Sequence, residues 1–157
     1  MLNSELYKFA CKCLLLDKNS QFEIEVKNKF KSGQIDLERF VLLCSNHLVL
    51  PAIYFRLNNA GLFEYFPLDF ELHLKEIYHL NKKRNNEILL QIEELSNVLQ
   101  NHDIEPIYLK GTGNLMDNLY SNISDRMIGD ICLNWSYRSL SVPMLFCTRA
   151  IRVETMV

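Results

Sequence analysis

The feature that most constrains the fold is a change of hydrophobic pattern near Asn101. Through most of residues 3–100, apolar side chains recur every three or four positions, and beyond them the pattern gives way to short apolar runs separated by turn residues. The first pattern is typical of amphipathic helices and the second of strands joined by turns. We therefore expect an α+β fold, mostly α overall, in which a helical region at residues 1–103 precedes the start of a mixed sheet.

The helical region contains signals for five helices. Apolar residues at helical spacing predict the first helix around residues 6–14 and a second, weaker one at about residues 20–31. The remaining helices are predicted from residues that cap, start or stop a helix. These are Asp36 at the N-cap of the third, Pro51 in the first turn of the fourth, Gly61 at its end, and Pro67 before the longest, which runs to about Asn101.

A polar cluster interrupts the apolar stripe of the longest predicted helix. It covers residues 81–86 and reads Asn-Lys-Lys-Arg-Asn-Asn. One interpretation is a solvated stretch of helix. The other is a basic patch that faces the cleft of the following domain, where phosphate groups would require cations. The sequence leaves both open.

Residues 104–133 predict a strand, a turn, a short helix and a second strand. The first strand covers residues 104–109, the turn 110–113, the helix 114–120 and the second strand 127–133. In the turn, Gly111 and Gly113 permit close backbone approach, and Thr112 offers a hydroxyl at a helix N-terminus. Such an end suits a phosphate group. The alternative is an ordinary strand-to-helix turn with Thr112 as its N-cap.

Asp130 is the polar residue of interest in the second strand. Strand alternation places Ile128, Asp130 and Cys132 on one face, and Ile131 and Leu133 on the other. The two apolar residues would anchor the strand in the core, and Asp130 would then point toward the space above the glycine turn. A solvent-facing aspartate without a special role is the alternative.

Taken together, residues 35–131 resemble the polymerase-β-like nucleotidyltransferase superfamily. They are most similar to the group with an N-terminal helical region, a Leu-Lys-Gly turn, a short helix and an Arg-x-x-Gly-Asp-Ile-Asp strand. The corresponding residues are Leu109-Lys110-Gly111 and Arg126-Met127-Ile128-Gly129-Asp130-Ile131. The resemblance implies Mg²⁺-dependent transfer of a nucleotidyl group from an NTP to a hydroxyl acceptor, which the sequence does not identify.

The resemblance also implies a role for each matching residue. Gly111 and Thr112 would cradle the triphosphate, and Lys110 would neutralise phosphate charge or merely end the strand. Arg126 would contact the nucleotide or pair with a neighbouring aspartate. Asp130 would be the catalytic carboxylate that binds Mg²⁺.

The sequence departs from the family pattern at Cys132, where the second metal-binding carboxylate belongs. A thiol is a soft ligand, whereas Mg²⁺ requires hard oxygen ligands. Glu154 is the one candidate for a third carboxylate. We therefore expect a frameshift or truncation after Ile131, a partial nucleotidyltransferase core at residues 104–132, an atypical tail at residues 133–157, and little or no activity. A divergent member that ends in this way is the alternative.

Composition excludes several other classes of protein. A net charge of −2 gives no strong nucleic-acid signal, and five scattered cysteines fit free thiols in a reducing cytoplasm. No signal peptide or membrane span is expected.

An alternative function is a non-catalytic helical interaction protein with a degenerate nucleotide-binding remnant, suggested by the long helix and by Trp135, Leu145 and Phe146. An open sheet edge would favour self-association.

Overall fold

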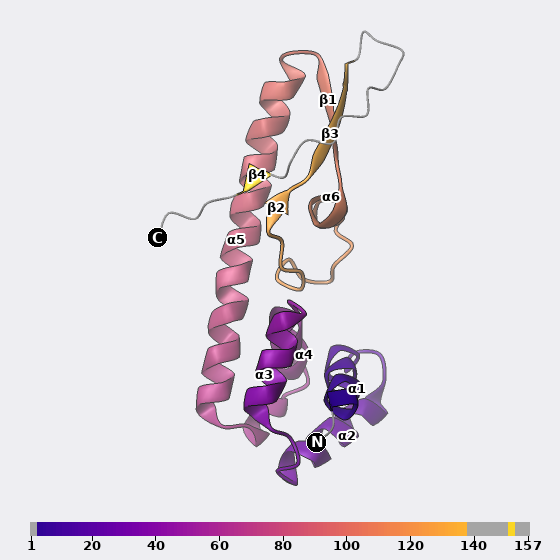
Figure 1. The fold of residues 1–157 in the computed structure, drawn as a ribbon, viewed down its shortest axis with the longest axis vertical. Coiled ribbons are helices and arrows are strands. Elements are labelled where there is room, and N and C mark those ends of the chain that lie inside the picture. Colours follow the sequence, from indigo (N-terminus) through magenta and orange to yellow (C-terminus); the bar gives the residue numbers. More distant parts are fainter. Residues whose placement is uncertain (1–2, 138–150, 153–157) are drawn as a thin grey trace. The chain divides into compact units, whose positions relative to one another are not determined.

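The computed structural model describes residues 3–137 and 151–152, which divide between two compact units (Figure 1). The helical unit comprises Met1–Asn81 and Ser124–Arg126, and the sheet unit comprises Lys82–Ile123 and Met127–Val157. Helices predominate, as predicted. Leu145, Phe146 and Glu154 lie outside the described residues, as does the side chain of Trp135. Within the described ranges, no helix is both long enough and apolar enough to span a membrane.

The helical unit is built from short amphipathic helices and the first part of a long one. Its elements are α1 (Asn3–Leu14), α2 (Ser20–Lys31), α3 (Leu37–Asn46), α4 (Leu50–Asn59), the 3₁₀ helix η1 (Leu62–Tyr65) and the beginning of α5 (Leu68–Gln100). Their apolar faces enclose one core, with Phe9, Phe40, Ile53 and Leu74 fully buried at its centre.

The predicted helix signals of this unit are confirmed. The Asp36 carboxylate accepts a hydrogen bond from the Arg39 backbone N–H at 3.1 Å and caps α3. Pro51 lies in the first turn of α4, where a missing N–H costs nothing. Gly61 follows the end of α4 with a φ of 64°, a backbone conformation that glycine adopts without steric cost. Pro67 directly precedes α5.

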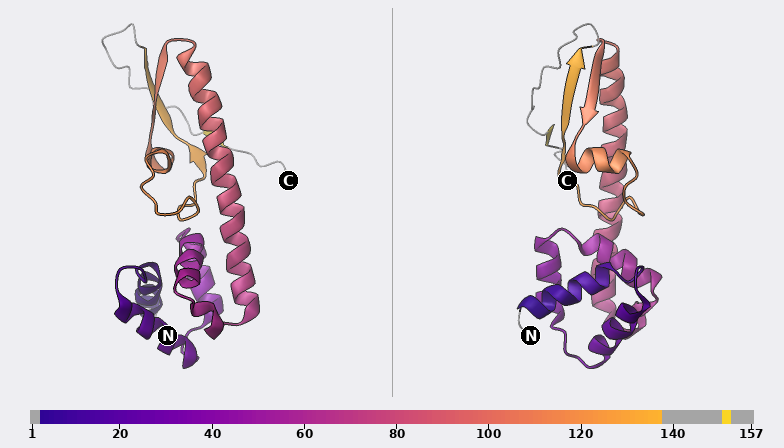
Figure 2. Two further views of the ribbon diagram at one scale, coloured as in Figure 1. Left: turned by 180° about the vertical axis from the view of Figure 1, so that it is seen from behind. Right: turned by 90° about the vertical axis from the view of Figure 1, so that its right-hand side faces the viewer.

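Among the residues that the structure describes, the sheet unit combines the second part of α5 with one short helix and four short strands. They are β1 (Ile104–Tyr108), α6 (Lys110–Met116), β2 (Asp130–Ile131), β3 (Leu133–Tyr137) and β4 (Ile151–Arg152). β1 and β3 pair antiparallel and run side by side in Figures 1 and 2, and β2 pairs antiparallel with β4. The core of this unit joins α5, α6 and the strands through Ile88, Ile92, Leu115, Ile128, Ile131 and Leu133.

Several predicted boundaries in this unit are wrong, and the predicted helix also ends at Met116, not at Tyr120. The helix begins at Lys110, not at Asn114, because Lys110 adopts a φ of 55° and turns the chain from β1 directly into α6. The Lys-Gly-Thr-Gly segment is therefore the first turn of the helix. The second strand begins at Asp130, not at Met127, and continues as β3 to Tyr137, so the predicted tail starts with regular structure.

Candidate functional site

Thr112 joins the first turn of α6 to the strand that carries Asp130. The threonine is 1% exposed, and its hydroxyl donates to the Asp130 carbonyl oxygen at 3.1 Å. The Thr112 hydroxyl oxygen in turn accepts a hydrogen bond from the Cys132 backbone N–H at 3.2 Å. Leu109, not Thr112, is the N-cap of α6, so the sequence-based expectation of a threonine cap is wrong. The Thr112 hydroxyl instead fixes the backbone on both sides of Ile131.

Asp130 and Cys132 lie on the same face of this strand segment. The Cys132 thiol donates to Asp130 Oδ2, with the sulfur 3.6 Å from the oxygen. Asp130 is half-buried and Cys132 is buried. Alternation correctly predicted that residues two apart would share a face. The site therefore has a carboxylate beside a thiol, at a place where the family pattern expects two carboxylates.

The glycines of the first helical turn differ in what the fold requires of them. A Cβ on Gly113 would lie 2.7 Å from the carbonyl oxygen of Tyr108, so α6 approaches β1 too closely for any side chain there. A Cβ on Gly111 would meet only the Ile128 side chain, at 3.4 Å. Packing thus explains Gly113, whereas a Cβ on Gly111, next to the exposed Lys110, would make only an ordinary contact with the buried Ile128 side chain.

The polar cluster on α5 holds the backbone that leads into Asp130. In the sheet unit, Asn85 Nδ2 donates to the Ile123 carbonyl oxygen at 2.5 Å, and Arg84 Nη2 donates to the Gly129 carbonyl oxygen at 3.2 Å. In the helical unit, Asn81 Nδ2 donates to the carbonyl oxygens of Ser124 and Arg126, at 2.8 and 3.1 Å.

This arrangement was missed from the sequence, although a signal for it exists. Asn81 and Asn85 continue the apolar stripe of α5 in register with Tyr78 and Ile88, and they are 3% and 0% exposed. The interpretation of the whole cluster as solvated helix is therefore wrong at these two positions. A buried amide within an apolar stripe requires a partner, and here the partners are main-chain carbonyl oxygens.

Arg126 belongs to the helical unit, whereas Asp130 belongs to the sheet unit. Its side chain is exposed, and its carbonyl oxygen is one of the two held by Asn81. The neighbouring Asp125 forms an ion pair with Arg56, with Oδ2 3.2 Å from Nη2. A contact between Arg126 and a nucleotide stays a prediction.

Comparison with known proteins identifies the family of this chain. The sequence model of a family described as uncharacterised nucleotidyltransferase matches residues 33–134, which include β1, α6, Asp130 and Cys132. The chain belongs to this family. The resemblance predicted from the Lys-Gly turn and the Gly-Asp-Ile segment is thereby confirmed. No curated protein and no solved structure matches the chain significantly.

The donor atoms around Asp130 do not fit a pair of Mg²⁺ ions. Asp130 supplies one carboxylate, and its Oδ2 already accepts from the Cys132 thiol. Nowhere in residues 3–137 and 151–152 do three or more His, Cys, Asp or Glu side chains gather closely enough to hold a metal ion. Mg²⁺ binds through oxygen ligands in a near-octahedral arrangement, and Cys132 supplies none.

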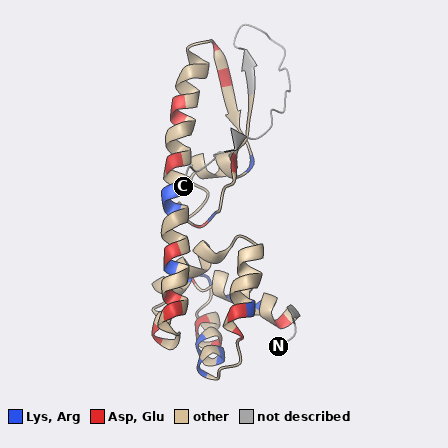
Figure 3. Ribbon diagram, turned by 60° about the vertical axis from the view of Figure 1, so that its left-hand side comes forward, with Lys and Arg blue, Asp and Glu red and all other residues tan. Residues whose placement is uncertain are grey.

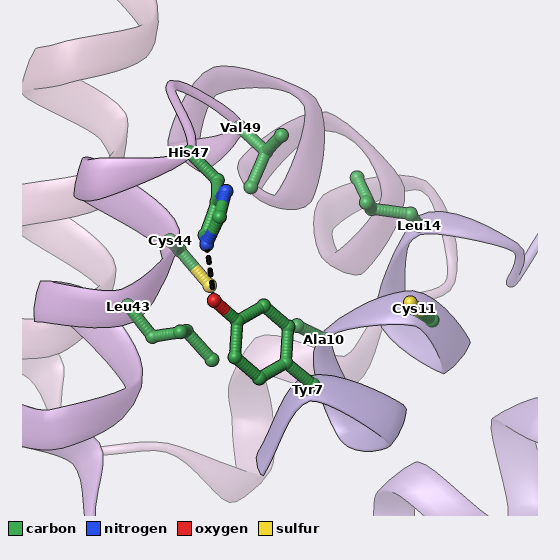
Figure 4. A pocket seen from close by; sticks show the side chains of 8 residues that line it. All are labelled: Tyr7, Ala10, Cys11, Leu14, Leu43, Cys44, His47 and Val49. Carbon is green, nitrogen blue, oxygen red and sulfur yellow. Dashed lines mark hydrogen bonds between the residues drawn. The ribbon is translucent and has the colours of Figure 1, made fainter. Parts of the chain in front are cut away.

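A separate pocket in the helical unit of the nucleotidyltransferase is mostly apolar (Figure 4). It encloses about 210 Å³ between α1 and α3 and is lined by Leu and Val side chains together with Cys44. At its edge, the Tyr7 hydroxyl and His47 Nε2 form a 2.6 Å hydrogen bond.

Burial raises the pKa of the Cys44 thiol to about 12 and that of Cys13 well above its ordinary value. Neither thiol is a nucleophile at neutral pH, because only the thiolate reacts readily.

We expect alkaline pH to destabilise the fold through Cys44. The thiol ionises near pH 9 when the chain is unfolded but only near pH 12 when it is folded. Its contribution to stability is therefore complete below pH 9 and is lost as the pH rises toward 12. Urea unfolding at a series of pH values should show the free energy of unfolding falling more steeply for the wild type than for Cys44→Ala. Parallel curves for the two proteins would contradict this expectation.

Proposed function

We propose that this chain binds a nucleoside triphosphate at the first turn of α6 and that its nucleotidyl-transfer step is impaired. The observation that carries the proposal is the Thr112 hydrogen-bond bridge. It fixes the first turn of α6 against the backbone of Asp130 and Cys132. The arrangement of turn, helix and carboxylate supports nucleotide binding, and the thiol beside the carboxylate accounts for the impairment.

Each residue of the turn would contribute differently to binding. Lys110 is exposed and would supply positive charge to the phosphates. Gly111 would let a phosphate approach the backbone, since no packing in the fold requires a glycine there. Thr112 would act indirectly, because its hydroxyl is already bonded on both sides to the strand.

Transfer would suffer because charge neutralisation dominates such chemistry. When bound beside the phosphates, Mg²⁺ supplies electrostatic stabilisation of the developing charge. Asp130 would be its carboxylate ligand, and weak binding is expected because Cys132 adds no oxygen ligand. The acceptor would be a hydroxyl group, and the family scaffold by itself does not specify which molecule carries it.

A thermal-shift experiment tests the proposal. We expect one of ATP, CTP, GTP or UTP, with Mg²⁺, to raise the Tm of the wild type. A ligand at 100 times its Kd adds about 2.7 kcal/mol to the free energy of unfolding. Gly111→Ala should lose most of this shift while keeping a similar Tm without ligand, since its new methyl group meets only a side chain. Lys18→Ala, at a residue of the helical unit that is 72% exposed, is the control.

Two other outcomes would overturn parts of the proposal. Rapid Mg²⁺-dependent NTP turnover that Asp130→Ala abolishes would show that the transfer step is intact. We also expect Cys132→Asp alone not to create turnover. A concentration-dependent dimer without any nucleotide-induced shift in Tm would instead favour the alternative, a non-catalytic interaction protein.

A further inference from the structure

The side chain of Arg84 extends from α5, and its guanidinium contacts Gly129, the residue before Asp130. Its Nη2 donates to the Gly129 carbonyl oxygen at 3.2 Å, and the side chain is half-buried. Arg84 forms no ion pair with any described residue. Its Nε is buried and has no hydrogen-bond partner among residues 3–137 and 151–152. The guanidinium thus has positive charge and hydrogen-bonding capacity that its contact with Gly129 does not use.

Holding a carbonyl oxygen does not require a positive charge. Also on α5, one turn earlier and one residue later, Asn81 and Asn85 hold carbonyl oxygens with neutral amides. A half-buried charge without a counter-charge lowers stability, because desolvation opposes it. The fold therefore has a neutral means of holding this backbone, and the charge at Arg84 needs another explanation.

The other basic residues of the cluster differ from Arg84. Lys82 and Lys83 are exposed, and Lys83 lies 3.9 Å from Glu87 one helical turn away. Together with Arg84 they form the basic band along α5 in Figure 3. Among the described residues, Arg84 is the member of this band that donates a hydrogen bond to the Gly129 carbonyl oxygen. A guanidinium also binds two phosphate oxygens at once more readily than an ammonium group does.

We propose that Arg84 binds a phosphate group of the nucleotide, with Nη1 and Nη2 facing the anion beside Gly129. This inference rests on the proposed function and adds to the site a residue that lies outside the Lys-Gly turn and the Asp130 segment. It assigns to α5 a direct part in nucleotide binding in addition to its packing role.

Calorimetric titration of four proteins tests the assignment. The proteins are the wild type, Arg84→Gln, Arg84→Lys and the exposed control Lys83→Gln. The ligands are the most stabilising of ATP, CTP, GTP and UTP, its nucleoside, and inorganic tripolyphosphate. Arg84→Gln removes the charge and keeps a polar, shorter amide side chain. It should weaken binding of the triphosphate and of tripolyphosphate by about 10-fold or more, the usual effect of losing a charged hydrogen bond.

The nucleoside separates a phosphate contact from a purely structural role. We expect Arg84→Gln to leave nucleoside binding unchanged, Arg84→Lys to recover part of the loss, and Lys83→Gln to bind all ligands as the wild type does. Equal weakening of nucleoside and triphosphate, or no weakening at all, would overturn the assignment while leaving the proposed function intact. Absence of binding by the wild type would overturn the proposed function and this inference together.

Discussion

Replacing Gly113 by alanine should destabilise the sheet unit by about 3 kcal/mol, the upper part of the range for overpacking a tight contact. The added Cβ would lie 2.7 Å from the Tyr108 carbonyl oxygen and 3.2 Å from its carbonyl carbon. Both atoms belong to the backbone of β1, so they cannot move aside as the end of a side chain can. Relief of the contact would require α6 to move away from β1 and would disturb the Thr112 bridge.

Urea unfolding followed by circular dichroism measures the effect, with Gly129→Ala as the control. A Cβ on Gly129 meets no atom within 4 Å, and the backbone there lies outside the left-handed region. The two variants make the same chemical change, so their difference isolates the contact with Tyr108. Similar midpoints for both would mean that α6 is not held this close to β1.

The second large effect is expected at Arg56 of the helical unit. Its side chain is 15% exposed and pairs with Asp125, which is 7% exposed. Arg56 Nε also lies 3.4 Å from Asp17 Oδ1. Arg56→Ala leaves the Asp125 carboxylate buried without this cation, and breaking a buried pair in this way costs about 3–5 kcal/mol. Thermal and urea unfolding should both register the loss.

A surface pair in the same segment supplies the control. Lys18 is 72% exposed and lies 3.4 Å from Asp17, so Lys18→Ala should change the free energy of unfolding little. Combining Arg56→Met with Asp125→Asn should recover part of the stability lost in Arg56→Ala, since no unpaired charge remains. A double variant as unstable as Arg56→Ala would assign the loss to the packing of Arg56 instead of its charge.

The helical half of the fold could be predicted from local rules. Asp36, Pro51, Gly61 and Pro67 act through backbone geometry within one or two turns, and such effects depend little on the rest of the structure. The apolar stripe of α5 is equally local. These signals therefore gave the correct helices without any knowledge of what the helices pack against.

The errors arose where distant segments determine local structure. The positive φ of Lys110 starts α6 early, and nothing in the type of this residue indicates that conformation. The strand starts late because side chains of α5 hold the carbonyl oxygens of Ile123 and Gly129. The shared face of Asp130 and Cys132 was predictable from alternation alone, but the hydroxyl bridge of Thr112 was not.

The hydrogen bonds from α5 have a consequence for how this protein tolerates change. Their acceptors at residues 123, 124, 126 and 129 are main-chain carbonyl oxygens, which every amino acid has. Substitutions in the held segment can therefore preserve these bonds, whereas substitutions of the donors Asn81, Arg84 and Asn85 cannot. The backbone conformation of residues 123–129, which precede Asp130, thus depends on side chains of α5 some forty residues earlier in the sequence. The side chains of residues 123–129 are correspondingly less constrained by these bonds.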